Sequence, residues 1–241
     1  MAEDHTITSG NVDVIRPDQT TVPGYLAQPA AVDRAPGVLV IHEAGGLNEN
    51  IRDVADRFAR AGYVALAVDL FAGSHRRLCM LRVMGAALLR PLDSSGLHAL
   101  QESIAWLQRQ PGVDPDRIGV VGFCMGGGFA LALACVDRAL KSAASFYGGN
   151  PRPLSAVAAA CPIVGSFPGN DRFTRGGAVK LEAALTRYGV PHDIKTYPDT
   201  RHSFFNDRGP TYDADAAQDA WERMLAFFRD HLGAVSVSPT G

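Results

Sequence analysis

A glycine-framed turn at Cys124 constrains the fold of this chain more than any other stretch. Residues 118–123 form an apolar run typical of a buried strand, and a glycine-rich helix start follows directly. Cys124 lies between the two, framed by Gly122 and Gly126. A strand that turns at once into a helix crowds its backbone, and glycines at these positions keep Cβ atoms out of the crossing. The pattern predicts a nucleophile elbow with sulfur in place of the usual serine oxygen.

The position of Cys124 also favours reactivity. It lies at a predicted helix N-terminus, where unpaired N–H groups and the helix dipole favour a thiolate. The alternative is a small buried hydrophobe, which is the usual role of a lone cysteine. We favour the nucleophile because strand, turn and helix surround this residue in the required order.

Apolar strand-like runs alternate with amphipathic helical segments along most of the chain. Residues 5–28 predict two or three short antiparallel strands at the start. Further strands are expected at residues 37–41, 63–71, 118–123, 140–147, 162–167 and 192–197. The clearest helix begins at Asp93 or Ser94, and a short linking helix is expected over residues 151–160. Such alternation predicts an α/β fold with a mostly parallel sheet and helices on both faces.

We expect the whole chain, residues 1–241, to form one domain, since no internal repeat or linker interrupts it. Two segments are expected to stand apart from the core. Residues 72–93 interleave arginines with apolar residues and predict a short lid. The tail after residue 233 is expected to be flexible.

Composition excludes several classes of function. The net charge is −2 with no strong basic or acidic run, so nucleic acid and anionic membrane are poor partners. No apolar run is long enough to cross a bilayer, and the first residues lack the layout of a signal peptide. The four cysteines show no spacing typical of zinc or of a disulfide framework. We therefore expect a cytoplasmic monomer or homodimer without a metal.

Four residues that could carry chemistry follow separate predicted strands. Ligands of parallel sheets bind at the carboxyl ends of the strands, and Glu43, Cys124, Asp171 and His202 all fall there. The order of nucleophile, acid and histidine is that of α/β-hydrolases. Cys124 would attack a carbonyl, and His202 would take the thiol proton and later protonate the leaving group. Asp171 would hold the imidazole tautomer.

An oxyanion hole should accompany this triad. The backbone N–H of Met125 is one donor by its position after the nucleophile. The second donor should come from the glycine loop after residues 37–41, most simply from the N–H of Ala44.

Each partner of the cysteine also has a structural interpretation. Asp171 could cap the following helix, and Asn170 competes with it for the acid role. His202 could be a surface loop residue. Glu43 could be a solvated carboxylate, a second base, or a group that holds the thiol at rest. His42 is expected to be structural.

Three motifs resemble the dienelactone hydrolase family, whose members are carboxymethylenebutenolidases. They lie at residues 122–127, 169–172 and 202–204, and the resemblance runs from about residue 24 to residue 231. It implies an α/β-hydrolase fold, no metal or organic cofactor, and hydrolysis of an enol-lactone or related small-molecule ester. It also implies the triad of Cys124, Asp171 and His202.

The resemblance extends to Glu43, which looks like the family glutamate that activates the thiol when substrate displaces it. Two departures affect specificity. Arg201 precedes the histidine where the family usually has glycine, and Asn206 occupies the place of an arginine that binds a substrate carboxylate. The candidates for substrate binding are therefore Arg77, Arg82, Phe204 and Arg208.

The sequence thus predicts a cysteine-dependent hydrolase of lactones or small carboxylic esters that works through an acyl-enzyme on Cys124. One alternative is a thioesterase or acyltransferase with the same triad. Another is a non-catalytic member that binds small carboxylates in an inherited pocket.

Overall fold

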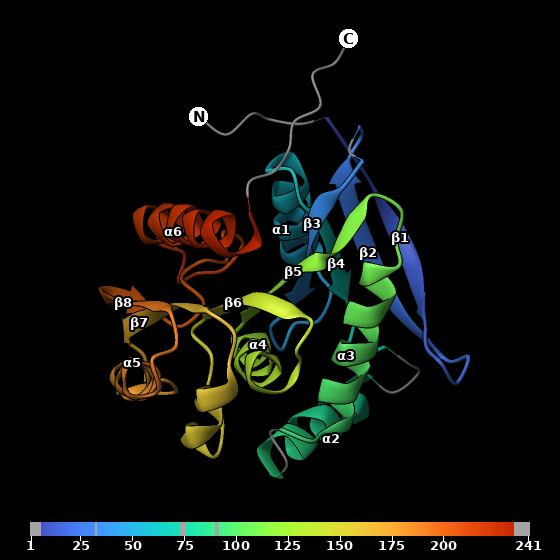
Figure 1. The fold of residues 1–241 in the computed structure, drawn as a ribbon. Coiled ribbons are helices and arrows are strands. Elements are labelled where there is room, and N and C mark those ends of the chain that lie inside the picture. The colour runs from blue at the N-terminus through green and yellow to red at the C-terminus, as the bar shows by residue number, and fades with distance from the viewer. Residues whose placement is uncertain (1–5, 32, 73–75, 90–91, 234–241) are drawn as a thin grey trace.

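The computed structural model describes residues 6–31, 33–72, 76–89 and 92–233, and contains one eight-stranded sheet. Its strands lie in the order β1-β2-β4-β3-β5-β6-β7-β8 (Figure 1). Their bounds are β1 Ile7–Ile15, β2 Thr21–Pro29, β3 Ala35–Ile41, β4 Val64–Val68, β5 Val113–Phe123, β6 Leu140–Phe146, β7 Ile163–Asn170 and β8 His192–Arg201. The helices are α1 Glu49–Arg60, α2 Arg76–Leu89, α3 Ser95–Gln108, α4 Met125–Val136, α5 Gly177–Tyr188 and α6 Ala214–Leu232, with a 3-10 helix η1 at Leu154–Ala159.

The sheet is mostly parallel, as the alternation of strands and helices predicts. β1 and β2 form an antiparallel hairpin, and β2 also pairs antiparallel with β4. From β4 through β8 every neighbouring pair is parallel. The predicted antiparallel start and doubly covered parallel sheet are both confirmed.

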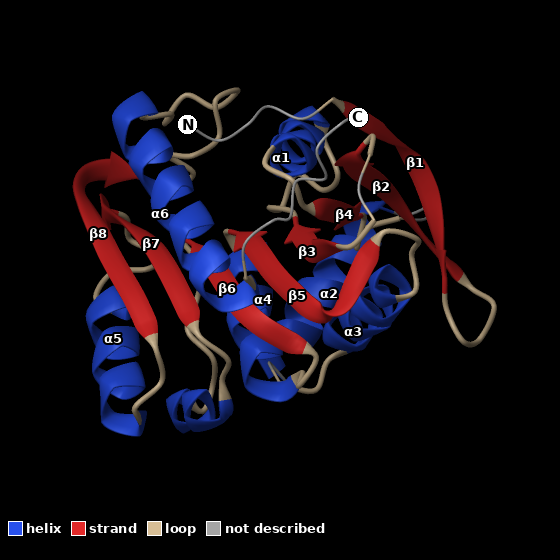
Figure 2. Cartoon of the chain, turned by 45° about the horizontal axis from the view of Figure 1, so that its top comes forward, coloured by secondary structure: helices blue, strands red, loops and turns tan. Residues whose placement is uncertain are grey.

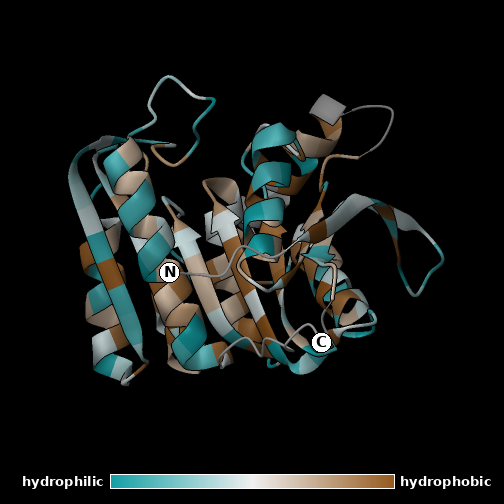
Figure 3. Cartoon of the chain, turned by 90° about the horizontal axis from the view of Figure 1, so that it is seen from above, coloured by the Kyte–Doolittle hydropathy of each residue, from teal (hydrophilic) through white to brown (hydrophobic). Residues whose placement is uncertain are grey.

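Helices cover both faces of this sheet. α1 and α6 lie on one face, and α3, α4 and α5 lie on the other (Figures 1 and 2). All seven residues of β3 are buried, because a parallel strand between two helical layers has no solvated face. Figure 3 colours the chain by hydropathy. Apolar colours lie on the central strands, and hydrophilic colours lie on the outer side of α6.

Parallel pairing brings four strand ends to one edge of the sheet. β3 ends just before Glu43, β5 just before Cys124, β7 just before Asp171 and β8 just before His202. These strands begin at the opposite edge, so the loops that carry the predicted chemistry all open on the same side.

Helix boundaries agree with the expected caps. Ser94 caps α3, and its hydroxyl accepts a hydrogen bond from the N–H of Leu97 at 3.3 Å. The linking helix expected over residues 151–160 is the six-residue 3-10 helix η1. No helix in the described ranges is both long and apolar enough to cross a bilayer.

The segment predicted as a lid contains helix α2. Val83 of α2 is buried toward α3, since a Cβ placed on Gly96 would lie 3.2 Å from its Cγ1. Residues 73–75 and 90–91 of this segment, and the tail after residue 233, lie outside the described residues. The lid function and the single-domain organisation stay predictions.

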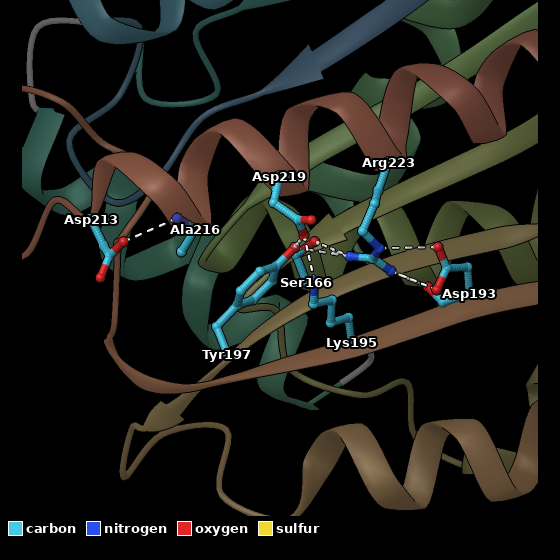
Figure 4. Close-up of polar contacts among 8 residues, drawn as sticks. All are labelled: Ser166, Asp193, Lys195, Tyr197, Asp213, Ala216, Asp219 and Arg223. Carbon is cyan, nitrogen blue, oxygen red and sulfur yellow. Dashed lines mark hydrogen bonds and ion pairs between the residues drawn. The ribbon is translucent and has the colours of Figure 1, made fainter.

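Polar side chains of α6 join this helix to β8 (Figure 4). Asp219 accepts hydrogen bonds from Lys195 at 2.7 Å and from the hydroxyl of Tyr197 at 2.6 Å. Arg223 forms an ion pair with Asp193 at 2.6 Å and also donates to Tyr197 at 3.1 Å. Because β8 leads to His202, this network stabilises the strand that carries the histidine loop.

Replacing Arg223 should measure the strength of this attachment. Its side chain is only 16% exposed, so Arg223→Leu leaves several acceptors without their charged donor. We expect the free energy of unfolding to fall by about 1–3 kcal/mol in urea denaturation. The matched control is Arg229→Leu, an exposed arginine of the same helix without a hydrogen bond or ion pair in the described residues. Equal losses in both variants would contradict the assigned role of the network.

Candidate active site

The turn at Cys124 has the strained geometry expected of a nucleophile elbow. Its φ and ψ are 53° and −114°, a region that non-glycine residues rarely adopt. A Cβ on Gly122 would lie 1.9 Å from the carbonyl oxygen of Gly126, and a Cβ on Gly126 would lie 2.3 Å from that of Ile41. Glycine is therefore required on both sides of the cysteine, for the steric reason that the sequence suggests.

Backbone strain is concentrated around this turn. Four non-glycine residues of the described chain have positive φ, and three of them, Cys124, Tyr147 and Ser203, adjoin the strand ends described above. The N–H of Cys124 donates to the carbonyl of Phe146 at 3.0 Å, which fastens the elbow to β6. Strain that persists in this way is typical of functional sites.

Asp171 and His202 form a direct pair. The imidazole Nδ1–H donates to the Asp171 carboxylate at 2.7 Å, and the aspartate side chain is only 1% exposed. The carboxylate also accepts from the N–H of Phe173 at 2.8 Å and the hydroxyl of Thr174 at 2.7 Å. Asp171 does not cap α5, because the cap position of that helix is Gly176.

The pKa values of this pair move in opposite directions. Burial acts to raise the pKa of Asp171, but hydrogen bonds from His202, Thr174 and Phe173 outweigh it and lower the pKa. Burial acts to lower the pKa of His202, but hydrogen bonds to Cys124 and Asp171 and their negative charge raise it to about 9. The structure therefore favours a protonated imidazole between the Asp171 carboxylate and the Cys124 side chain.

Glu43 is held beside this pair by two side chains. Tyr147 donates its hydroxyl to the carboxylate at 2.9 Å, and the amide of Asn206 donates at 3.3 Å. Burial and the negative charge of Glu43 raise the pKa of Tyr147 well above its ordinary value, so the phenol remains a donor. Asn206 thus supports Glu43 in this chain.

His42 is fully buried, and its hydrogen bonds fix its tautomer. The N–H of Leu70 donates to Nε2 at 3.0 Å, so Nε2 carries a lone pair and Nδ1 carries the proton. Nδ1 then donates to the carbonyl oxygen of Glu43 at 2.6 Å. The same oxygen accepts from the N–H of Gly46 at 3.0 Å. The peptide between Glu43 and Ala44 is therefore fixed by two donors.

A cavity of about 660 Å³ opens beside the cysteine. Its lining consists of Cys124, Met125, Gly128, Phe129, Ala132, Tyr147, Gly149, Asn150, Pro151, Arg152, Phe173, Thr174 and His202. The structure thus brings the predicted nucleophile, histidine and oxyanion donor Met125 to one cavity, with Asp171 directly behind the histidine.

The predicted substrate-binding residues lie elsewhere. Phe204 is fully buried against Tyr147 and Tyr197, so it belongs to the core. Arg208 forms ion pairs with Glu49 and Asp53 of α1, at 2.5 Å and 2.6 Å. The remaining candidates lie on α2, where Arg82 is exposed outside the cavity lining and the side chain of Arg77 lies outside the described residues.

Sequence reasoning missed most residues of the cavity lining, among them Tyr147, Arg152 and Phe173. Tyr147 directly follows a predicted strand, and that position could have suggested a role. Phe173 lies two residues after the predicted acid, within the same turn. No sequence pattern distinguishes Arg152 from other loop arginines.

Among the described residues, no group of three histidine, cysteine, aspartate or glutamate side chains is arranged to hold a metal ion. The charged and nucleophilic groups at the strand ends are instead arranged in a chain, from Asp171 through His202 to Cys124. Such a chain suits proton transfer to and from a nucleophile.

An elbow after a central strand, with histidine and acid on later strand ends, defines an α/β-hydrolase. The family model "Dienelactone hydrolase family" matches residues 22–232. A protein of Synechocystis sp., provisionally named carboxymethylenebutenolidase, is 34% identical over 88% of this chain and 92% of its own length. Another with that provisional name, from Saccharolobus solfataricus, is 32% identical over 88% of this chain and 95% of its own.

Solved structures agree. A provisionally assigned dienelactone hydrolase of Klebsiella pneumoniae superposes with a TM-score of 0.82 at 26% identity, over 93% of this chain and 99% of that one. The chain belongs to the dienelactone hydrolase family. The predicted family, fold and enzyme class are confirmed, and the protein is a hydrolase that acts on ester or lactone bonds of small molecules.

The pKa of His202 should depend on the neighbouring sulfur. Cys124→Ala removes contacts that raise the pKa of His202, so we expect this pKa to fall below about 9. NMR titration of the imidazole would measure the change. Since about 9 lies above the ordinary value of 6.5, protonated His202 stabilises the native state. That contribution is complete below pH 6.5 and is lost as the pH rises through 9. Cys79→Ala should leave the titration unchanged, and an unchanged pKa in Cys124→Ala would refute the coupling.

Proposed function

We propose that this protein hydrolyses lactones or small carboxylic esters through an acyl-enzyme on Cys124. The observation that carries the proposal is the Asp171–His202 hydrogen bond, with His202 and Cys124 lining one cavity and the cysteine on a strained elbow. Each residue then has the role that its contacts allow.

In the first half of the reaction, the Cys124 sulfur attacks the ester carbonyl carbon while His202 holds the proton of the thiol. A C–S bond forms, and the carbonyl oxygen becomes an oxyanion. The imidazolium then donates its proton to the leaving alkoxide, and the ester C–O bond breaks. Asp171 keeps Nδ1 protonated throughout, so that Nε2 faces the reacting atoms.

In the second half, water replaces the alcohol. His202 takes a proton from the water as its oxygen attacks the thioester carbon. The C–S bond then breaks, the acid leaves, and the proton returns to the sulfur or remains on the imidazole. For a lactone the two products are one hydroxy acid, because the alkoxide stays attached to the acyl group.

The oxyanion is stabilised by the backbone N–H groups of Met125 and Ala44. Met125 is the first residue of α4, so its N–H precedes the hydrogen-bond ladder of the helix. In a trans peptide the C=O and N–H point in opposite directions. Because His42 and Gly46 bind the Glu43 carbonyl, they direct the Ala44 N–H to the other side, where no described group accepts from it.

Glu43 acts next to the thiol as a second carboxylate. Its hydrogen bonds from Tyr147 and Asn206 hold its carboxylate in one orientation after the end of β3. We propose that, when substrate displaces it from these donors, Glu43 takes the thiol proton and passes it to His202, which then holds the proton during the attack.

A thiol nucleophile requires a reducing compartment, so we infer a cytoplasmic location. The four cysteines are all free in the structure, which supports this inference. The monomeric or homodimeric state and the absence of nucleic-acid partners stay predictions.

Cys124→Ala should abolish hydrolysis of p-nitrophenyl acetate, with a loss of kcat of at least about 10³-fold, while the circular dichroism spectrum stays native. The alanine has no nucleophilic atom, and the elbow glycines remain. Cys79→Ala is the matched control, because that thiol bonds only to the carbonyl of Leu70 at 3.4 Å in the described structure. Turnover retained by Cys124→Ala would refute the acyl-enzyme. A preference for thioesters over oxyesters would instead indicate a thioesterase.

His42→Val should lower kcat by about 10²-fold with little change in KM, because an oxyanion donor acts mainly in the transition state. Alkylation of Cys124 by iodoacetamide forms no oxyanion, so its rate should change much less. His42→Asn, which keeps an N–H donor close to the position of Nδ1, should recover part of the loss. Parallel losses of hydrolysis and alkylation would show a collapsed elbow instead.

A further inference from the structure

The wall of the cavity beside Cys124 has a chemistry of its own. Six of its lining residues are apolar or aromatic: Met125, Phe129, Ala132, Tyr147, Pro151 and Phe173. Its volume of about 660 Å³ falls in the range of pockets that enclose ligands larger than a single five-membered ring. The size and the apolar wall both favour a ligand with a substantial apolar group.

The polar residues of the wall are mostly engaged within the protein. Thr174 donates its hydroxyl to Asp171 at 2.7 Å, and the amide N–H of Asn150 donates to the carbonyl of Gly177 at 2.9 Å. The buried Oδ1 of Asn150 has no hydrogen-bond partner among the described residues. Arg152 is exposed, and a long cationic side chain can keep its charge in water while its alkyl stem lies over apolar groups. Beyond the catalytic groups, the exposed Arg152 and the Asn150 amide oxygen, the wall therefore offers apolar contact.

Helix α4 supplies one side of the cavity through small residues. Gly128 and Ala132 are four positions apart, so they share one face of the helix directly after the nucleophile. A Cβ on Gly128 would approach the Gly149 carbonyl to 3.4 Å, an ordinary contact, so glycine is not required there for steric reasons. The small side chains at these two positions leave the space that the cavity occupies.

Phe173 also lines the cavity, where its ring contacts that of the histidine. Its side chain is 86% exposed, although it is a large aromatic residue. The ring centroid lies 5.4 Å from that of His202 in an edge-on arrangement. Its N–H bonds to the Asp171 carboxylate at 2.8 Å, so the ring is tied to the pair of acid and histidine. An exposed aromatic ring fixed at the mouth of an apolar cavity gains free energy when a ligand covers it.

We propose that this cavity is an apolar subsite and that the preferred substrates are esters with a medium-length alkyl or aryl acyl group, which would pack between Phe173 and the Gly128–Ala132 face of α4. This inference rests on the proposed function for the chemistry of bond cleavage. Phe173 and Ala132 are then specificity-determining residues. Phe173 covers the acyl group, and the size of the side chain at Ala132 sets how deep an acyl group the cavity accepts.

A series of p-nitrophenyl esters tests the subsite. Wild-type kcat/KM should rise from acetate through butyrate to hexanoate. Phe173→Ala should lower the ratio of hexanoate to acetate by about tenfold, the usual effect of one lost apolar contact. Ala132→Leu should shift the preferred chain to a shorter length by filling the cavity. Val179→Ala is the matched control, since Val179 is an exposed apolar residue of α5 outside the cavity lining. It should leave the ratio unchanged.

A second measurement separates failure of the subsite from failure of the proposed function. Octanoate should slow the alkylation of Cys124 by iodoacetamide in the wild type, and Ala132→Leu should weaken that protection. If no ester is hydrolysed but octanoate protects in this way, the subsite stands and the hydrolytic function falls. If esters are hydrolysed equally well at every chain length, or both variants keep the wild-type ratio, the subsite is refuted and the hydrolytic function stands. Absence of both hydrolysis and protection refutes both.

Discussion

The active site depends on the close approach of three backbone segments at the elbow. β5 ends, α4 begins, and the end of β3 lies against the first turn of that helix, so that a Cβ on Gly126 would meet the Ile41 carbonyl at 2.3 Å. This contact sets the direction in which Cys124 points and brings the Glu43–Ala44 peptide beside the helix N-terminus. The sheet provides the platform, but the absence of side chains at Gly122 and Gly126 permits the geometry.

The electrostatics of the site follow from this packing. Asp171 is buried and stays ionised because three donors bind its carboxylate. His202 is partly buried, yet its pKa is raised because hydrogen bonds and electrostatic interactions with Cys124 and Asp171 outweigh the effect of burial. The second carboxylate, that of Glu43, has separate hydrogen-bond donors, Tyr147 and Asn206. Asp171 and Glu43 are thus two carboxylic acids at one site that have different hydrogen-bond partners, and such partners determine how readily each acid binds a proton.

The sequence predicts well what depends on local order along the chain. Apolar runs place the strands, and the parallel connection brings Glu43, Cys124, Asp171 and His202 to one edge, which can be foreseen from their positions alone. Contacts between side chains of distant segments cannot be predicted from local order along the chain. Nothing near Arg208 indicates that its partners lie on α1, and nothing near Asn206 indicates that it bonds to Glu43.

The lining of the cavity is hardest to foresee because it depends on side-chain direction. Phe204 and Phe173 are both aromatic residues close to a proposed catalytic group, yet one is fully buried and the other is 86% exposed. The difference arises from the turns that carry them. Phe204 turns into the core between Tyr147 and Tyr197, whereas the Asp171 turn presents Phe173 outward.

The turn from Asp171 to Thr174 has two roles: it binds the Asp171 carboxylate, and it forms part of the cavity wall. The N–H of Phe173 and the hydroxyl of Thr174 bind the carboxylate, while the aromatic ring of Phe173 lines the cavity. Changes in this turn that adapt the enzyme to a new ligand therefore risk disturbing the acid. Substitutions on α4 at Gly128 and Ala132 would not disturb the acid in this way, because neither residue makes a side-chain hydrogen bond to the triad in the described structure. Divergence of ligand preference among relatives is therefore expected to proceed through the size of helix residues, with the turn held constant.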